Sequence, residues 1–224
     1  MTIVGVMVFI LICLFGQDVI PHKEKEEVPQ AGVVSEKWDF RFGGYIVFII
    51  IPYFFIMMFV DYFFPVYAVE NGMTVDTIGY VMLFYGIATA YIGARFCDRL
   101  MKKFSPTMLM SVTMLLLSGA IFLFAAKNHV IFTVVIVLLI GVVAGVMPSA
   151  QFEYVYHLPI SKRLGFSKTL GIEGFFSSLI GAVAPVIFSV LMMYGNGGLA
   201  VVAALICVSA VLFIILNGKK KKRV

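Results

Sequence analysis

One acidic residue, Asp61, stands among aromatic and aliphatic residues in the stretch FIMMFVDYFFPVYAVENG, Phe55 to Gly72. Because proline has no amide hydrogen, Pro65 cannot bond to the carbonyl of Asp61, which lies four residues earlier in a helix. The carboxylate and the freed carbonyl offer adjacent acceptors for a proton, a sodium ion or a cationic group of a substrate. One interpretation is therefore that Asp61 lies on a pathway for a solute or a coupling ion.

Two further residues share the helical face of Asp61. Tyr53 lies two turns before it and Met57 one turn before it, so we predict that both line the same cavity. A rise of about 1.5 Å per residue places Asp61 about 24 Å beyond Tyr45, in the outer third of a spanning helix. A partly solvated acid near a helix end is therefore the second interpretation, and the sequence leaves both open.

The elements that position these residues are predicted to be membrane helices. Hydrophobic residues make up 62% of the 224-residue chain and charged residues 13%, with a mean hydropathy of +1.04. A soluble domain could not cover that much apolar surface. A helix needs about 20 apolar residues to cross a bilayer, whereas barrel strands alternate over about 10 residues. The chain has seven runs of helical length: residues 2–20, 44–67, 77–97, 107–126, 130–150, 168–193 and 197–216. The predicted fold class is an all-α membrane protein with seven transmembrane helices.

The distribution of lysine and arginine predicts the orientation. Of the 17 basic residues, 16 follow the first, third and fifth runs or form the C-terminal tail, and only Lys127 falls on the other side. By the positive-inside rule, the C-terminus is expected in the cytoplasm and the N-terminus outside the cell membrane. No basic soluble face for nucleic acid exists, and the three cysteines have no metal-site spacing. We therefore expect no nucleic-acid partner, no metal and no cofactor.

Polar and small residues distinguish the runs from one another. The runs 107–126 and 197–216 are almost uniformly apolar, so we predict that they face lipid. The fifth and sixth runs carry Gln151 and Glu173, and their small residues recur every three or four places, which lets helices approach closely. These small residues are Gly141, Gly145, Ser149, Gly174, Ser178 and Gly181. Similar polar exceptions in the two halves of the last six runs indicate an internal repeat, as in secondary transporters.

The stretch ARFCDRLMKKF, Ala94 to Phe104, resembles the signature loop of the major facilitator superfamily, G-x-x-x-D-R-x-G-R-[RK]. Ala94 and Met101 stand where that pattern has glycine. The D-R pair and the closing basic pair are matched by Asp98, Arg99, Lys102 and Lys103. The passage from Pro65 to Gly93 is also similar to the family's helices seven and eight, and GIEGFFSSLIGAVAP to its helix eleven.

The resemblance implies an alternating-access secondary transporter, present as a C-terminal half. Residues 1–21 resemble helix six, residues 22–42 the central cytoplasmic linker, residues 43–218 the C-terminal six-helix bundle, and residues 219–224 form a basic cytoplasmic tail. Family transporters enclose one pathway between two halves. The expected partners are therefore the bilayer, a small solute with a proton or sodium ion, and a missing N-terminal half or partner subunit. A truncated or split product is expected.

The resemblance also implies roles for the candidate residues. The predicted pathway residues are Asp61, Tyr53, Met57 and Gln151, because family helix seven lines the central cavity. The predicted gating residues are Asp98, Arg99, Lys102, Lys103 and Glu173. Glu173 is expected to pair with Arg95 or Arg99 at a helix N-terminus, which favours a carboxylate.

The sequence bears on two functions other than transport, catalysis and ligand sensing or scaffolding. Catalysis is not expected, because only one aspartate lies within the bilayer and no serine–histidine pair does, so the chain is predicted not to be an enzyme. The alternative to transport is a transporter-derived sensory or scaffolding module, which binds a ligand or partner without moving it.

Overall fold

The computed structural model describes residues 40–126, 130–193 and 196–218. All of these residues belong to one unit that begins at Lys37. The predicted first helix at residues 2–20, most of the linker and the basic tail lie outside the described residues. Six helices in the described part are long and apolar enough to cross a membrane, which confirms the other six predicted runs: Phe40–Glu70, Val75–Met101, Pro106–Ala126, Ile131–Tyr156, Phe166–Leu191 and Gly197–Asn217.

The first two spans are interrupted helices. The first span consists of α2 (Phe40–Tyr45), the π-helical turn η2 (Ile46–Ile50), α3 (Ile51–Met58), the π-helical turn η3 (Phe59–Phe63) and α4 (Phe64–Glu70). The second span consists of α5 (Val75–Ile87), the π-helical turn η4 (Ala88–Gly93) and α6 (Ala94–Met101).

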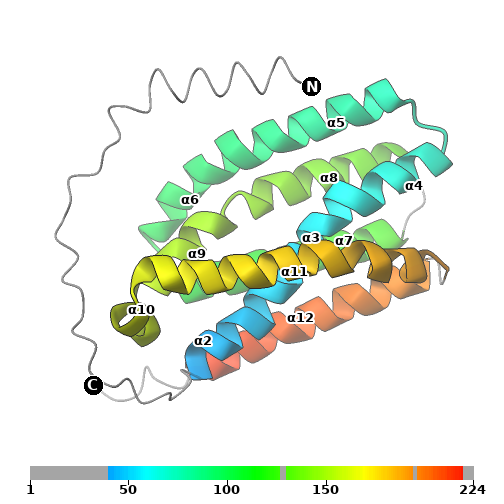
Figure 1. Ribbon diagram of the computed structural model, residues 1–224. Coiled ribbons are helices and arrows are strands. Elements are labelled where there is room, and N and C mark those ends of the chain that lie inside the picture. Colours follow the sequence, from blue (N-terminus) through cyan, green and yellow to red (C-terminus); the bar gives the residue numbers. More distant parts are fainter. Residues whose placement is uncertain (1–39, 127–129, 194–195, 219–224) are drawn as a thin grey trace, which may run out of the picture. The chain divides into compact units, whose positions relative to one another are not determined.

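The remaining spans are more regular. The third is α7 (Pro106–Ala126), and the fourth is split into α8 (Val130–Ala144) and α9 (Met147–Tyr156). A short helix, α10 (Pro159–Leu164), leads into the fifth span, α11 (Phe166–Met193), and the sixth is α12 (Asn196–Gly218). Figure 1 shows the spans running roughly side by side, with α2 to α4 crossing obliquely from α12 towards α5.

Both π-helical turns of the first span come immediately before a proline-containing helix start. The Ile51 N–H bonds to the Ile46 carbonyl, and the Phe64 N–H bonds to the Phe59 carbonyl, five residues back in each case. A proline ring clashes with the carbonyl four residues earlier, and a wider π turn makes room for it. The loosened backbone expected at Asp61 is thus a π-helical turn, and Asp61 lies within it.

A carbonyl freed by proline is satisfied from a neighbouring helix. Pro52 has no N–H for the carbonyl of Phe48, four residues earlier, and the Ser209 hydroxyl of α12 donates to that carbonyl at 2.6 Å. Backbone polar groups at membrane depth need such internal partners, because lipid supplies none. The bond therefore fixes α12 against η2 at the point where the first span is irregular.

The uniformly apolar runs are not the ones that are most exposed. Buried residues make up 56% of the apolar stretch of α7, but only 11% of that of α11 and 24% of that of the α5–α6 span. α7 packs most extensively against α12, and the Ser118 hydroxyl donates to the Ala203 carbonyl at 2.7 Å. The prediction that residues 107–126 face lipid is therefore wrong for the side of α7 that packs on α12, while Leu116, Phe122 and Leu123 stay exposed. Lipid and a neighbouring helix are both apolar, so composition cannot tell them apart.

Small residues bring α8 into backbone contact with the second span. A Cβ added to Gly145 would collide with the carbonyl of Thr89, and one added to Gly93 would meet the Cα of Gly145. A Cβ added to Gly141 would lie 2.9 Å from a ring carbon of Tyr85. The close approach predicted from Gly141 and Gly145 is therefore confirmed. Gly174 and Gly181 of α11 have open space around them, so the same prediction for α11 is wrong in this structure.

We expect Gly145→Ala to lower the free energy of unfolding by about 1–3 kcal/mol, because the new methyl group overpacks a backbone–backbone contact. Gly119→Ala in α7 is the control, since no atom lies within 4 Å of its added Cβ and alanine favours a helix over glycine. Thermal unfolding followed by circular dichroism in detergent measures both. Equal stability of the two variants would contradict the contact.

Candidate functional site

Asp61 lies between the second and fifth spans and has an exposed side chain. It interacts electrostatically with the phenol groups of Tyr53 and Tyr85. Its neighbour Tyr62 points to α11, where the hydroxyl lies 3.4 Å from that of Ser189. No ion pair within the described residues neutralises Asp61, so its carboxylate can accept a proton or a cation.

Tyr53 is only 5% exposed and serves the backbone of α8. Its hydroxyl donates to the carbonyl of Ala144 at 3.4 Å. That carbonyl lacks its helical partner because Pro148, four residues later, has no N–H. Tyr53 also lies close enough to Asp61 to interact with it electrostatically. Its hydroxyl, however, is already bonded to the backbone at the break between α8 and α9.

Met57 is half-buried and contacts a residue that the sequence reasoning missed. The Tyr85 hydroxyl of α5 lies 3.5 Å from the Met57 sulfur, and the Thr89 hydroxyl donates to the Tyr85 carbonyl at 2.9 Å. A tyrosine four residues before a threonine in an otherwise apolar run was the available signal, but neither residue carries a charge. The structure thus brings Tyr53, Met57, Asp61 and Tyr85 together.

Glu173 of α11 lies in a second polar cluster, beside Tyr45 at the end of α2. It is 9% exposed and interacts with the hydroxyl of Tyr45, which is fully buried. Neither the Tyr45 hydroxyl nor the Glu173 Oε2 atom has a hydrogen-bond partner within the described residues. No ion pair joins Glu173 to Arg95 or Arg99 in this conformation, so that pairing stays a prediction.

Gln151, predicted on the pathway, is buried in α9, and its Nε2 atom has no partner among the described residues. One turn further along, the Tyr154 ring packs against Tyr45 with centroids 5.1 Å apart, and its hydroxyl donates to the Asn217 side chain at 3.2 Å. Gln151 thus belongs to the end of the bundle near Glu173. Within the described residues, no contact joins it to Asp61.

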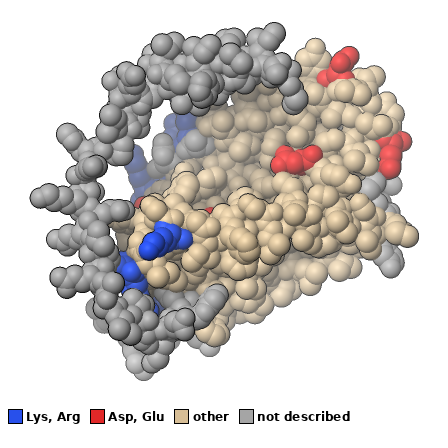
Figure 2. Space-filling model, viewed as in Figure 1, with Lys and Arg blue, Asp and Glu red and all other residues tan. Residues whose placement is uncertain are grey.

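The signature residues lie at the end of the second span. Asp98 and Arg99 fall within α6, so the helix continues through the D-R pair. Lys102 follows its last residue as the C-cap. Arg99, Lys102 and Lys103 are exposed, while the Asp98 side chain lies outside the described residues. Figure 2 shows Lys and Arg side chains of the visible face gathered at one end of the bundle, whereas most of the acidic surface of that face lies towards the other end.

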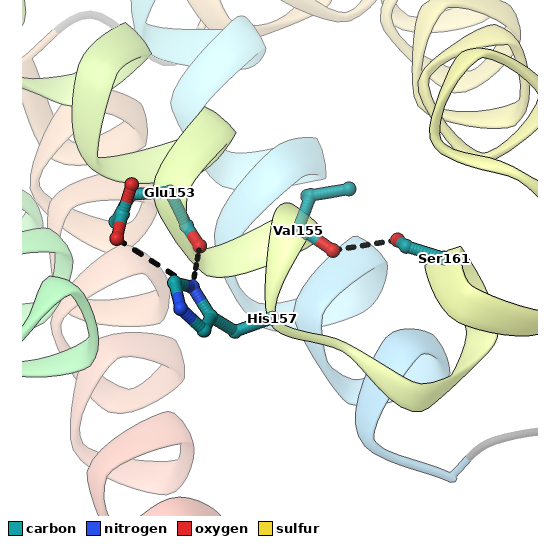
Figure 3. A network of polar contacts seen from close by, with 4 residues as sticks. All are labelled: Glu153, Val155, His157 and Ser161. Atoms are coloured by element: carbon teal, nitrogen blue, oxygen red, sulfur yellow. Dashed lines mark hydrogen bonds and ion pairs between the residues drawn. The ribbon is translucent and has the colours of Figure 1, made fainter. Parts of the chain in front are cut away.

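The same end carries an exposed acid–base pair on α9. His157 Nδ1 lies 3.5 Å from the carboxylate of Glu153 and 2.9 Å from its backbone oxygen. Figure 3 shows this pair beside the turn into α10, where the Ser161 hydroxyl donates to the Val155 carbonyl. Both residues line a pocket of about 560 Å³ together with Arg41. The pair is exposed at the rim of the bundle, and an exposed ion pair of this kind contributes little to stability.

Within the described residues, no group of three or more His, Cys, Asp or Glu side chains is placed to hold a metal ion. The described site therefore consists of one carboxylate, aromatic rings and a thioether.

Comparison with known proteins gives one match. A family model described as Major Facilitator Superfamily matches residues 1–159, which include the first four described spans. No curated protein and no solved structure matches the chain.

We expect Tyr53→Phe to lower the free energy of unfolding by about 1 kcal/mol, because the Ala144 carbonyl then loses its donor at membrane depth. Pro148→Ala restores a backbone N–H that can reach the same carbonyl. In the double variant, the cost of Tyr53→Phe should therefore disappear. A double-mutant cycle of thermal unfolding measures this coupling, with the exposed Tyr80→Phe as control. Strictly additive effects would contradict the bond.

Proposed function

Because the chain belongs to the Major Facilitator Superfamily, we propose that it supplies the C-terminal six-helix half of an alternating-access transporter for a small solute. Membership implies secondary transport in general, a multi-pass membrane protein and no enzymatic activity, as the sequence predicted. The proposal adds which half is present, which face lines the pathway and which residues act on it.

The observation that carries the proposal is the exposed Asp61 between two poorly buried spans, with no ion pair to it within the described residues. An ionisable side chain at membrane depth is costly unless it faces protein or water. The α5–α6 span and α11, on either side of it, are the two least buried spans. A face of this kind fits a surface that a second six-helix half would cover, with the pathway between the halves.

The gating role is proposed for the opposite, basic end of the bundle. Arg99, Lys102 and Lys103 are exposed there, and the family motif supports the same role for Asp98. Glu173 lies near the start of α11, within reach of Tyr45 rather than of an arginine in this conformation. We propose that the contact between Tyr45 and Glu173 breaks when the inner end closes, and that Glu173 then pairs with Arg95 or Arg99.

The proposed orientation places this basic end in the cytoplasm and residues 71–74, between α4 and α5, outside. Single cysteines at Asn71 and Asn128 should react with a membrane-impermeant maleimide added to intact cells, whereas one at Lys162 should react only after lysis. Lys162 and Asn71 are exposed. The three native cysteines, Cys13, Cys97 and Cys207, are first replaced by serine, and the cysteine-free chain is the control. Labelling of Lys162→Cys in intact cells would overturn the orientation.

The role of Asp61 is tested in the complete transporter, with an N-terminal half present in proteoliposomes. A mixture of sugars, amino acids, nucleosides and organic cations is supplied under a proton or sodium gradient, and the vesicle contents are read by mass spectrometry. We expect Asp61→Asn to abolish gradient-driven accumulation, because it removes the charge that binds the ion, and Asp61→Glu to retain part of it. Asp76→Asn, at an exposed helix start, is the control. Normal accumulation by Asp61→Asn would make Asp61 only a solvated helix end.

A further inference from the structure

We propose that the solute recognised at Asp61 is an amphipathic organic cation with a single positive charge. Its charged centre binds the carboxylate, and its apolar body packs on the aromatic rings of the first and second spans. This inference rests on the proposed transport function and adds the class of solute.

The sign of the solute follows from the charges around the site. Asp61 has no ion pair within the described residues, and the described basic residues lie at the opposite end of the spans: Arg41, Arg95, Arg99, Lys102, Lys103, Lys162, Arg163 and Lys168. Among the described residues, an anionic solute would meet a carboxylate and no cation. A charged side chain at membrane depth is stabilised by a partner of opposite sign, so a cation is the solute that this site stabilises.

The single charge follows from the number of acids. Glu173 is buried in the cluster with Tyr45, and Glu70 and Asp76 flank the turn beyond the membrane-facing part of the first two spans. Asp61 is therefore the one described carboxylate that the apolar part of this face exposes. A second positive charge on the solute would have no partner there.

The hydroxyl groups near Asp61 argue against a sugar or polyol. The Tyr53 hydroxyl donates to the Ala144 carbonyl, that of Tyr62 contacts Ser189, and that of Tyr85 contacts the Met57 sulfur. The Ser189 and Thr89 hydroxyls donate to backbone carbonyls of their own helices. A site that selects polyols needs several polar groups that are open to the solute. These three tyrosines present their rings to a solute, because their hydroxyl groups already contact other protein atoms.

Further exposed aromatic side chains lie on the second span, in α5 and η4. Tyr80, Phe84 and Tyr91 are 63%, 57% and 70% exposed, and Phe84 precedes the Tyr85 that interacts with Asp61. Aromatic faces attract cations and pack flat apolar groups. A carboxylate beside such rings complements a charged centre carried on an apolar body.

The test uses the full chain in nanodiscs of neutral lipid, with tetraphenylphosphonium as the probe and empty nanodiscs as the baseline. Equilibrium dialysis should show saturable binding that weakens at least tenfold in Asp61→Asn and is largely kept in Asp61→Glu. Asp76→Asn is the matched control, since it removes an exposed acid away from the site. Tetraphenylborate, which has the same shape and the opposite charge, should bind without dependence on Asp61.

Three results would overturn the inference: equal probe binding by the wild type and Asp61→Asn, equal loss in Asp76→Asn, or Asp61-dependent binding of tetraphenylborate. Circular dichroism confirms that each variant is folded. If probe binding does not depend on Asp61 but Asp61→Asn abolishes gradient-driven accumulation, the inference fails and the proposed transport function stands. If both measurements are insensitive to Asp61, both fail.

Discussion

The structure depends on the requirement that every backbone carbonyl at membrane depth has a donor within the protein. Proline breaks that rule locally, because it removes one N–H and widens the preceding turn. Two of the resulting carbonyls are satisfied across helices, that of Phe48 by Ser209 and that of Ala144 by Tyr53. The prolines therefore create contacts between helices as well as bends within one. Without these donors, the first and fourth spans would expose unpaired carbonyls to lipid.

The same irregular backbone positions the chemistry. Asp61 lies within a π-helical turn that precedes Pro65, and π turns are found frequently at functional sites. Opposite it, a third π-helical turn allows Thr89 and Gly93 to approach Gly145 at backbone distance. These contacts fix the second span against the fourth. Tyr85 of the second span contacts Met57 of the first, next to Asp61, and the site has contributions from both of these spans.

The two polar clusters differ in what surrounds their carboxyl groups. Asp61 is exposed beside aromatic rings on a face formed by poorly buried spans. Glu173 is enclosed near Tyr45, where the bundle is closed. An exposed acid can exchange partners with a pathway, whereas an enclosed acid can respond only when the helices around it move. This difference supports separate roles in solute recognition and in gating.

The sequence by itself determined the six described spans, their loop positions and the irregularity at Asp61, because length, apolarity and proline act locally. It also marked Gly145 as a point of close approach. Only the tertiary structure decided that α7 is more buried than α11, because apolar composition does not distinguish lipid from protein. The tertiary structure alone brought Tyr85 to Met57 and Tyr45 to Glu173. Such contacts depend on which helices meet, and no local pattern encodes that.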